Sequence, residues 1–172
     1  MELVKKIFDC VEIYKLKSRT DNRGPMTYAY EDCIDGFKIK ETRVYTMPQK
    51  GTFFGIHYSD EATPFSKFVS VVQGRGMDYV VDLRKDSATY LKWEAVELSA
   101  DNTLAVLVPA EIGHAFISLE DNTIQLFAIN KTGKDGHSKQ INYADPKIGL
   151  KLEIPITQIS DYDSNAPFWE KQ

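Results

Sequence analysis

The chain has 172 residues, with 21 Lys and Arg against 25 Asp and Glu, so its formal net charge is −4. This length and a hydrophobic content of 42% predict one globular domain over residues 1–172, and 9 Phe, 9 Tyr and 2 Trp exclude a disordered chain. The acidic balance argues against a nucleic-acid partner, and no apolar run is long enough for a membrane span or a secretory signal. With two cysteines and no CxxC motif, we expect a cytoplasmic protein with free thiols.

Short apolar segments, rich in β-branched and aromatic residues, follow one another from Thr52 to Asn130. Each is bounded by Gly, Asp, Asn, Ser or Pro, which is typical of an all-β sandwich or barrel. Helical turns are expected only at the periphery, in Glu31–Phe37 and in the Asp161–Trp169 tail. The predicted strands are Phe53–Tyr58, Lys67–Val72, Met77–Asp82, Tyr90–Leu98, Leu104–Val108, His114–Ser118 and Ile124–Asn130.

Lys67 lies in a strand whose alternation places it on the same face as Val69 and Val71. If that face lines a barrel interior, a cation sits in an apolar pocket. The alternative is that Lys67 is a charge on an edge strand and faces water.

The three histidines are His57, His114 and His137. Alternation places His57 on the face of Gly55 and Phe53. The H-x-H spacing of a metal-binding barrel is missing, so we expect no metal and favour a neutral histidine as a general base. The chain also lacks the G-x-S-x-G, Walker A and G-x-G-x-x-G motifs, which disfavours serine hydrolases, nucleotide kinases and Rossmann dehydrogenases.

Several motifs occur in a fixed order along the chain, and Lys67 follows His57 by ten residues. They are Asp21–Gly24 (D-x-R-G), Gly55–Tyr58 (G-L-H-[FY]), Val81–Asn102, Val108–Phe116 (P-x-x-x-x-H-x-F), Asp145–Leu150 (D-P-x-I-G-I) and Asp163–Pro167 (an Asp before A-P). Together they resemble the dTDP-4-dehydrorhamnose 3,5-epimerase family. The resemblance implies a cupin double-stranded β-helix, or jelly roll, which agrees with the strand pattern.

The family acts on nucleotide-linked 4-keto-6-deoxy sugars, whose ketone acidifies the hydrogens on C3 and C5. By resemblance, His57 is the base, Asp163 orients it, and Lys67 stabilises the enolate oxygen. No cofactor is implied, because the ketone itself is the electron sink. The structural alternatives are a buried His57 bonded to backbone and an Asp163 that is a solvated turn residue.

Resemblance also implies substrate-binding roles. Asp78 and His114 match residues of the active-site cavity, and Arg23 matches an arginine that grips the substrate, at a phosphate. Alternatively, Asp78 is a strand charge facing water and His114 is structural. His137 lies in a glycine-rich loop and is interpreted as a surface residue.

The sequence departs from the family pattern at several positions. Phe127 stands where the family has its proton-donating Tyr, and a phenyl ring cannot donate a proton. Phe54 replaces an Arg three residues before the base, which removes a cation from the pocket. Thr42 and Val44 replace Gln and Asn, and Lys131–Gly133 replaces a Tyr pair of which one member stacks on thymine.

We therefore predict an epimerase that inverts C3, with or without C5, of a hexose or heptose linked to dTDP, GDP or another nucleotide. Water or the hydroxyl of Tyr45, Tyr58 or Tyr79 would return the proton. One alternative is a 4-keto sugar ketoisomerase on the same fold. Another is a non-catalytic cupin that binds a sugar nucleotide or serves as a partner subunit, which Phe54 and Phe127 favour.

The resemblance further implies a homodimer that exchanges N-terminal segments, so that Arg23 serves the neighbour's site. The C-terminal tail is expected to cover the active site. The product would enter the synthesis of cell-surface polysaccharides, such as capsule or lipopolysaccharide.

Overall fold

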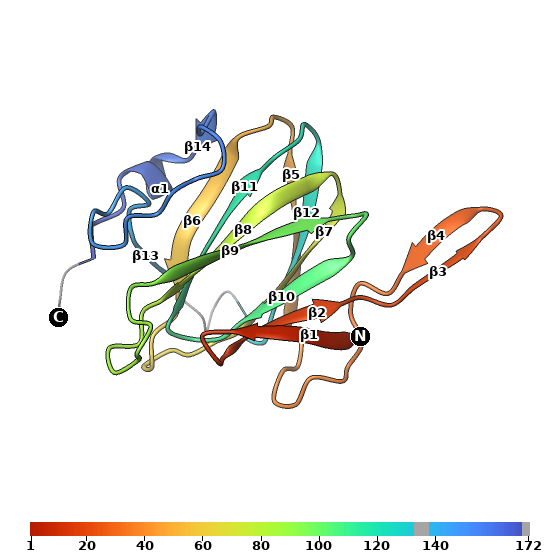
Figure 1. Ribbon diagram of the computed structural model, residues 1–172, viewed down its shortest axis with the longest axis horizontal. Helices are drawn as coiled ribbons and strands as arrows, with labels where there is room; N and C mark the ends of the chain where they lie inside the picture. Colours follow the sequence, from red (N-terminus) through yellow and green to blue (C-terminus); the bar gives the residue numbers. More distant parts are fainter. Residues whose placement is uncertain (133–137, 170–172) are drawn as a thin grey trace.

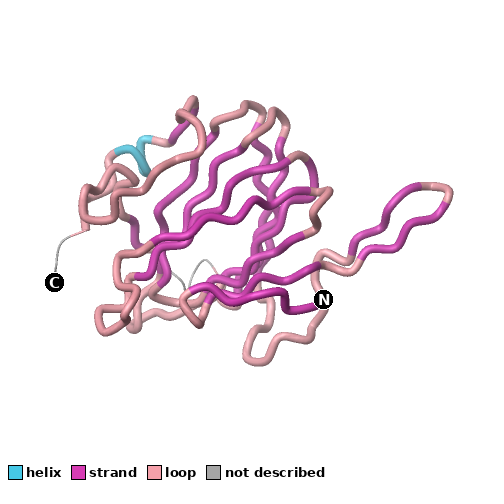
Figure 2. Tube along the Cα trace, viewed as in Figure 1, coloured by secondary structure: helices cyan, strands magenta, loops and turns pink. Residues whose placement is uncertain are grey.

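The computed structural model describes residues 1–132 and 138–169, so His137 lies outside the described residues. Two antiparallel sheets face each other and are joined by loops and turns (Figures 1 and 2). The expectation of an all-β jelly roll is confirmed. In the described part of the chain, no helix is long and apolar enough to cross a membrane.

The two sheets have different strand orders. The first sheet runs β1-β2-β10-β7-β12-β5, with β1 (Glu2–Ile7), β2 (Val11–Lys15), β5 (Glu41–Met47), β7 (Lys67–Gln73), β10 (Leu104–Val108) and β12 (Thr123–Ile129). The second sheet runs β13-β6-β11-β8-β9, with β6 (Thr52–Tyr58), β8 (Arg75–Asp82), β9 (Trp93–Ser99), β11 (Ile112–Ser118) and β13 (Lys139–Gln140), and β14 (Gln158–Ile159) pairs with β6. The remaining elements are the hairpin of β3 (Ser18–Asp21) and β4 (Gly24–Thr27), and the short helix α1 (Asp161–Ser164).

The predicted strands are present with small shifts at their ends. The one large difference is β9, which begins at Trp93 instead of Tyr90. Residues 87–92 form turns, in which the amide of Tyr90 bonds the Ser87 carbonyl and Leu91 has a φ of 60°. The expected helical turn at Glu31–Phe37 is wrong, because the segment has two isolated turns, in which the amides of Cys33 and Phe37 donate to the carbonyls of Glu31 and Ile34. The tail does contain a helical turn, α1.

The main core lies between the two sheets. Strand alternation sends Val69 and Val71 of the first sheet inward, where they meet Val80 and Phe116 of the second. A separate apolar cluster covers the outer face of the second sheet, where Phe53 and other strand residues contact the C-terminal segment. The C-terminal segment is therefore held against the outside of β6, which lets it reach the end of the cavity described below.

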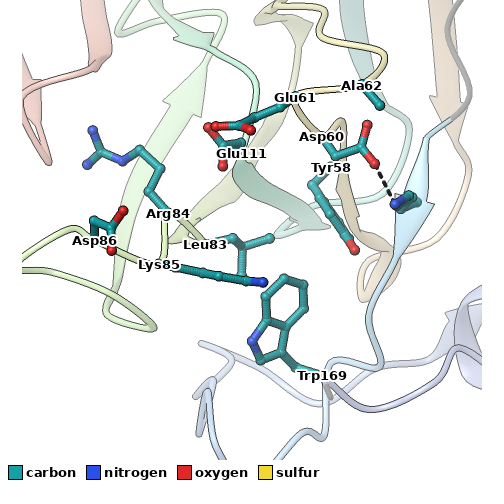
Figure 3. Close-up of a pocket in the computed structure, with 11 residues that line it drawn as sticks. Tyr58, Asp60, Glu61, Ala62, Leu83, Arg84, Lys85, Asp86, Glu111 and Trp169 are labelled. Atoms are coloured by element: carbon teal, nitrogen blue, oxygen red, sulfur yellow. Dashed lines mark ion pairs between the residues drawn. The ribbon is translucent and has the colours of Figure 1, made fainter. Parts of the chain in front are cut away.

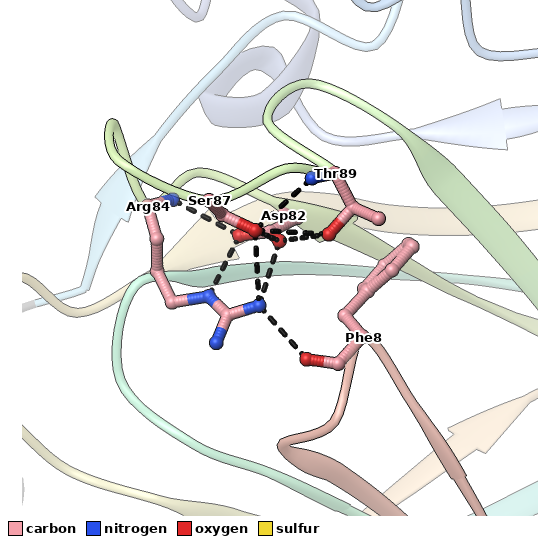
Figure 4. Close-up of polar contacts among 5 residues, drawn as sticks. All are labelled: Phe8, Asp82, Arg84, Ser87 and Thr89. Atoms are coloured by element: carbon pink, nitrogen blue, oxygen red, sulfur yellow. Dashed lines mark hydrogen bonds and ion pairs between the residues drawn. The ribbon is translucent and has the colours of Figure 1, made fainter.

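Asp82 ties the end of β8 to the following loop, and its partner Arg84 reaches the β1–β2 turn (Figure 4). Its carboxylate accepts hydrogen bonds from Arg84, Ser87 and Thr89, while Arg84 also donates to the carbonyl of Phe8 at 2.9 Å. Burial alone would raise the pKa of Asp82, but these donors outweigh it and lower the pKa to about 2. The Asp82 cluster is thus a structural feature of the Val81–Asn102 motif.

The β3–β4 hairpin projects away from the two sheets (Figure 1). All four residues of β3 are exposed, and the Arg23 side chain at the turn is 85% exposed. Among the described residues, Arg23 forms hydrogen bonds with Asp21 and with no residue of the core.

Candidate active site

A bulge in β6 aims His57 inward. His57 pairs with His114 of β11 and Phe54 pairs with Phe116, so three steps on β6 match two on β11. The extra residue changes the alternation, as β-bulges do. His57 therefore shares its face with Phe54 and not, as simple alternation predicted, with Phe53, which lies in the outer cluster.

Gly55 makes this bulge possible. Its φ is +123°, and a Cβ there would lie 2.6 Å from the Cβ of Ala115 on the neighbouring strand. Only glycine tolerates both the conformation and the close approach. The glycine of the G-L-H-[FY] motif thus sets the direction of the histidine two residues later.

Asp163 holds the His57 ring. Its Oδ1 lies 2.6 Å from His57 Nε2, and its Oδ2 accepts from the amide of Gly55 at 3.3 Å. Asp163 sits in α1, whose N-cap Ser160 accepts from the Asp163 amide, and it is buried. Because a carboxylate only accepts, Nε2 carries the hydrogen and Nδ1 has the free lone pair of a base. The solvated-turn alternative for Asp163 and the backbone-bonded alternative for His57 do not hold.

Lys67 is enclosed in the protein, with 3% of its surface exposed, so it is not a water-facing edge charge. β7 lies between β10 and β12, and the Lys67 ammonium donates to the carbonyl of His57 at 3.0 Å. Burial lowers the pKa of Lys67 from 10.5 to about 7, and the nearby Asp78 carboxylate opposes this shift. Lys67 is therefore a cation beside the histidine that can gain or lose its charge near neutral pH.

Asp78 and His114 form a second buried pair, with Asp78 Oδ2 2.8 Å from His114 Nε2. Asp78 is 1% exposed, which overturns the alternative of a charge facing water. The other Asp78 oxygen has no hydrogen-bond partner among the described residues. His114 reaches the cavity, whereas Asp78 lies behind it.

These side chains meet at a cavity of about 200 Å³ between the sheets. Of the predicted site residues, the structure brings His57, Lys67, His114, Phe54 and Phe127 to its wall, with Asp163 and Asp78 directly behind. The complete lining is Arg43, Tyr45, Phe54, His57, Lys67, His114, Phe116, Gln125, Phe127, Ser138 and Tyr162.

Arg43 and Tyr162 were missed by the sequence analysis. Arg43 stands opposite Phe127 across β5 and β12, so the cavity does contain a guanidinium in spite of Phe54. The family comparison of the sequence concerned Thr42 and Val44, but Val44 is 61% exposed and points away from the cavity. The alternation of Arg43 with Tyr45, two residues apart, was the signal that could have found this face. Tyr162 lies on α1, with its ring centroid 6.0 Å from that of His57.

The three tyrosines predicted as possible proton donors lie in different parts of the structure. Tyr45 lines the cavity. Tyr58 faces the other side of β6 and contacts Trp169, and Tyr79 is buried in the outer cluster, where its hydroxyl accepts from the amide of Glu153. Tyr58 and Tyr79 are therefore wrong as candidates. Arg23 is not part of this cavity either, because it lies at the tip of the projecting hairpin.

A wider groove of about 570 Å³ lies on the Tyr58 side of β6 (Figure 3). Tyr58 and Trp169 form part of its wall, and Lys139 is ion-paired with Asp60 there. Burial and the neighbouring Glu61 raise the pKa of Glu111. Apart from Tyr58, the groove contains none of the predicted site residues, so the smaller cavity is the candidate active site.

Similarity to known proteins shows which family the chain belongs to. The family model described as dTDP-4-dehydrorhamnose 3,5-epimerase matches residues 5–171. The chain belongs to the dTDP-4-dehydrorhamnose 3,5-epimerase family. Members of this family are isomerases, and the chain is accordingly a carbohydrate epimerase.

Individual members of the dTDP-4-dehydrorhamnose 3,5-epimerase family resemble the chain over most of its length. The dTDP-4-dehydro-6-deoxyglucose 3-epimerase of Streptomyces bikiniensis is 32% identical over 132 residues, which are 76% of this chain and 67% of that protein. The 3,5-epimerase of Methanothermobacter thermautotrophicus is 28% identical, covering 94% of this chain and 91% of that one. The crystal structure of the Bacillus anthracis 3,5-epimerase with TDP and PPi bound has a TM-score of 0.91, at 25% identity and 98% and 99% coverage.

Proposed function

We propose that the chain inverts C3, with or without C5, of a thymidine-diphosphate-linked 4-keto-6-deoxy sugar in the cytoplasm. The observation that carries this proposal is the 2.6 Å contact between His57 and Asp163 beside the buried Lys67. Binding alone requires neither a histidine held by a carboxylate nor a buried cation next to it. The non-catalytic alternative is therefore disfavoured.

The reaction follows from the placement of these groups. His57 Nδ1 takes the proton from C3, and the electrons of the C–H bond form a C3=C4 double bond. The C4 carbonyl pair moves to oxygen, where the Lys67 ammonium stabilises the enolate. Asp163 stabilises the imidazolium that forms. Return of a proton to the opposite face of C3 restores the ketone and completes the inversion.

Deuterium incorporation tests this proposal. In D₂O, the enzyme should place deuterium at C3 of a dTDP-4-keto-6-deoxy sugar and form the C3 epimer. His57→Asn should abolish both, and Tyr58→Phe, which changes the next residue on the other face, should leave both unchanged. Absence of exchange with dTDP-, GDP- and UDP-linked substrates would refute the proposal, and a 3-keto product by NMR would identify a ketoisomerase instead.

The carrier nucleotide is proposed from the relatives. The S. bikiniensis enzyme is named for a dTDP sugar, and a crystal structure from that organism, a 3'-monoepimerase in complex with dTDP-quinovose, matches at a TM-score of 0.85 and 26% identity. The Lys131–Gly133 departure weighs against stacking on thymine by a Tyr pair. The same substrate panel separates the carriers by their kcat/KM values.

We also propose a homodimer in which Arg23 of one protomer binds a substrate phosphate at its partner's cavity. A hairpin of two strands is marginal by itself in water, and here it projects with Met26 of β4 55% exposed. Mixing Arg23→Ala with His57→Asn tests this arrangement. Mixed dimers would hold one intact site and regain activity, whereas no recovery in a confirmed mixed dimer would refute it. Sedimentation measures the assembly state.

A further inference from the structure

The cavity has two walls of different chemistry. His57 and His114 are directly opposed on β6 and β11 of the second sheet, so their rings project from the same wall. Each ring is bonded by a carboxylate, Asp163 and Asp78 respectively. The facing wall belongs to the first sheet, whose strands β5, β7 and β12 supply Arg43, Tyr45, Lys67, Gln125 and Phe127.

Inversion of a carbon requires a proton acceptor on one face and a proton donor on the other. If His57 removes the proton from the second-sheet side, the donor must stand on the first-sheet side. That wall offers Arg43, Tyr45, Lys67, Gln125 and Phe127. Arg43 does not deprotonate, Gln125 is an amide, Phe127 has no polar atom, and Lys67 is engaged with the enolate oxygen. Tyr45 is the one hydroxyl among the described residues of this wall.

We propose that Tyr45 is the acid that returns the proton to C3, an inference that rests on the proposed epimerase function. The Tyr45 O–H bond breaks, its proton forms the new C–H bond on the face opposite to His57, and its electron pair remains on the phenolate oxygen. The enolate pair restores the C4 carbonyl. Transfer of the proton from the His57 imidazolium through water to the phenolate then resets the enzyme, with no net consumption of acid or base.

The surroundings of Tyr45 hold its ring in place. The ring meets Phe54 edge-to-face at 4.8 Å and Phe127 at 6.1 Å, so aromatic contacts from both sheets fix its orientation. Such edge-to-face contacts are favourable beyond the burial of the ring surfaces. A well-oriented donor is what proton transfer requires. The two Phe residues that replace polar groups at this site thus become the support of Tyr45.

Arg43 supplies a positive charge beside Tyr45, where a phenolate remains after the proton has left. It follows the same face of β5 as Tyr45, two residues away, and its pKa is raised mainly by a hydrogen bond to Glu41, with a smaller contribution from Tyr45. A guanidinium beside the hydroxyl stabilises the phenolate that remains after the transfer. Tyr162 does not have this position, because it lies next to His57 on the side of α1.

Separating exchange from inversion tests this role. In D₂O, Tyr45→Phe should still exchange the C3 hydrogen of the recovered substrate within about threefold of wild type, because His57 remains. Formation of the epimer should fall by about 100-fold or more, as expected for the loss of a general acid. Removing one hydroxyl leaves the ring contacts intact, and Tyr58→Phe is the matched control, with both rates unchanged.

A rescue variant makes the test independent of folding. Phe127 touches the Tyr45 ring and lines the same wall, so combining Tyr45→Phe with Phe127→Tyr restores a hydroxyl there. The double variant should form the epimer at least tenfold faster than Tyr45→Phe alone. Full inversion by Tyr45→Phe, or exchange without inversion in Tyr162→Phe instead, would overturn the assignment. If the wild type itself did not exchange the C3 hydrogen in D₂O, the proposed function would be refuted. That result is distinguishable from the two outcomes that overturn only the role of Tyr45.

Discussion

Replacing Lys67 by Met should increase the stability of the fold while it removes the charge that the reaction requires. Lys67 is 3% exposed, and burial lowers its pKa from 10.5 to about 7. At about 1.4 kcal/mol for each pH unit, this displacement corresponds to about 5 kcal/mol against the charged form in the folded protein. The unfolded chain carries the charge without that cost. Met has a similar volume and no charge, and it loses only the hydrogen bond to the His57 carbonyl, about 1 kcal/mol.

The sign of the pH dependence follows from the lowered pKa. Between pH 7 and 10.5 the unfolded state binds more protons than the folded state, so the stability of the wild type rises with pH. At pH 7 we expect Lys67→Met to be more stable by about 2–4 kcal/mol, and this advantage should shrink by about 2 kcal/mol at pH 9. Other titrating groups are common to both proteins and cancel in the difference.

Urea unfolding of both proteins at pH 7 and pH 9 measures these differences, and the deuterium assay measures activity. Lys67→Met should lose epimerisation by at least about 100-fold, because an unstabilised enolate raises the barrier by several kcal/mol. In the wild type, kcat/KM should decline as the pH rises through about 7, since the neutral amine offers no charge to the enolate. Equal urea midpoints for the wild type and Lys67→Met at both pH values would refute the reasoning on the buried charge.

Three further substitutions probe other parts of the molecule. Asp163→Asn should lower kcat by about 100-fold or more while KM changes little, because the amide no longer fixes the His57 tautomer; a loss under tenfold in steady-state assays would contradict the pairing. Gly76→Ala should reduce the free energy of unfolding by about 3 kcal/mol, since its Cβ would lie 2.0 Å from the Phe116 ring, and a neutral effect in urea would show that the ring moves aside. Asp82→Asn should cost about 2 kcal/mol at pH 7, because a folded pKa of about 2 lies below the ordinary 3.8. That deficit should disappear as the pH falls from 4 towards 2, and a constant deficit would argue against the charge.

Strand alternation predicted part of the site correctly. Lys67 does share an inward face with Val69 and Val71, because β7 is regular over these residues. The same rule failed for His57, since the bulge after Phe54 shifts the alternation by one residue. A glycine in a strand is a signal for a bulge, but the sequence does not say on which side the extra residue falls.

Long-range pairing accounts for what the sequence could not show. Arg43 and Tyr45 come to the cavity through the pairing of β5 with β12, two strands about 80 residues apart in the chain. The strand prediction began at Thr52, so β5 and its inward face were not recognised. The family resemblance did identify Asp163, although no local pattern connects it with a histidine more than 100 residues earlier.

The position of Asp163 also affects when the enzyme becomes active during its synthesis. The two sheets are complete apart from the short β14 once residue 140 has been added, whereas the carboxylate that holds the base arrives only with α1. Until α1 docks against β6, the His57 ring therefore lacks the carboxylate that orients it. Turnover therefore depends on the docking of the C-terminal segment, which both covers the outer face of the second sheet and places Asp163 behind His57.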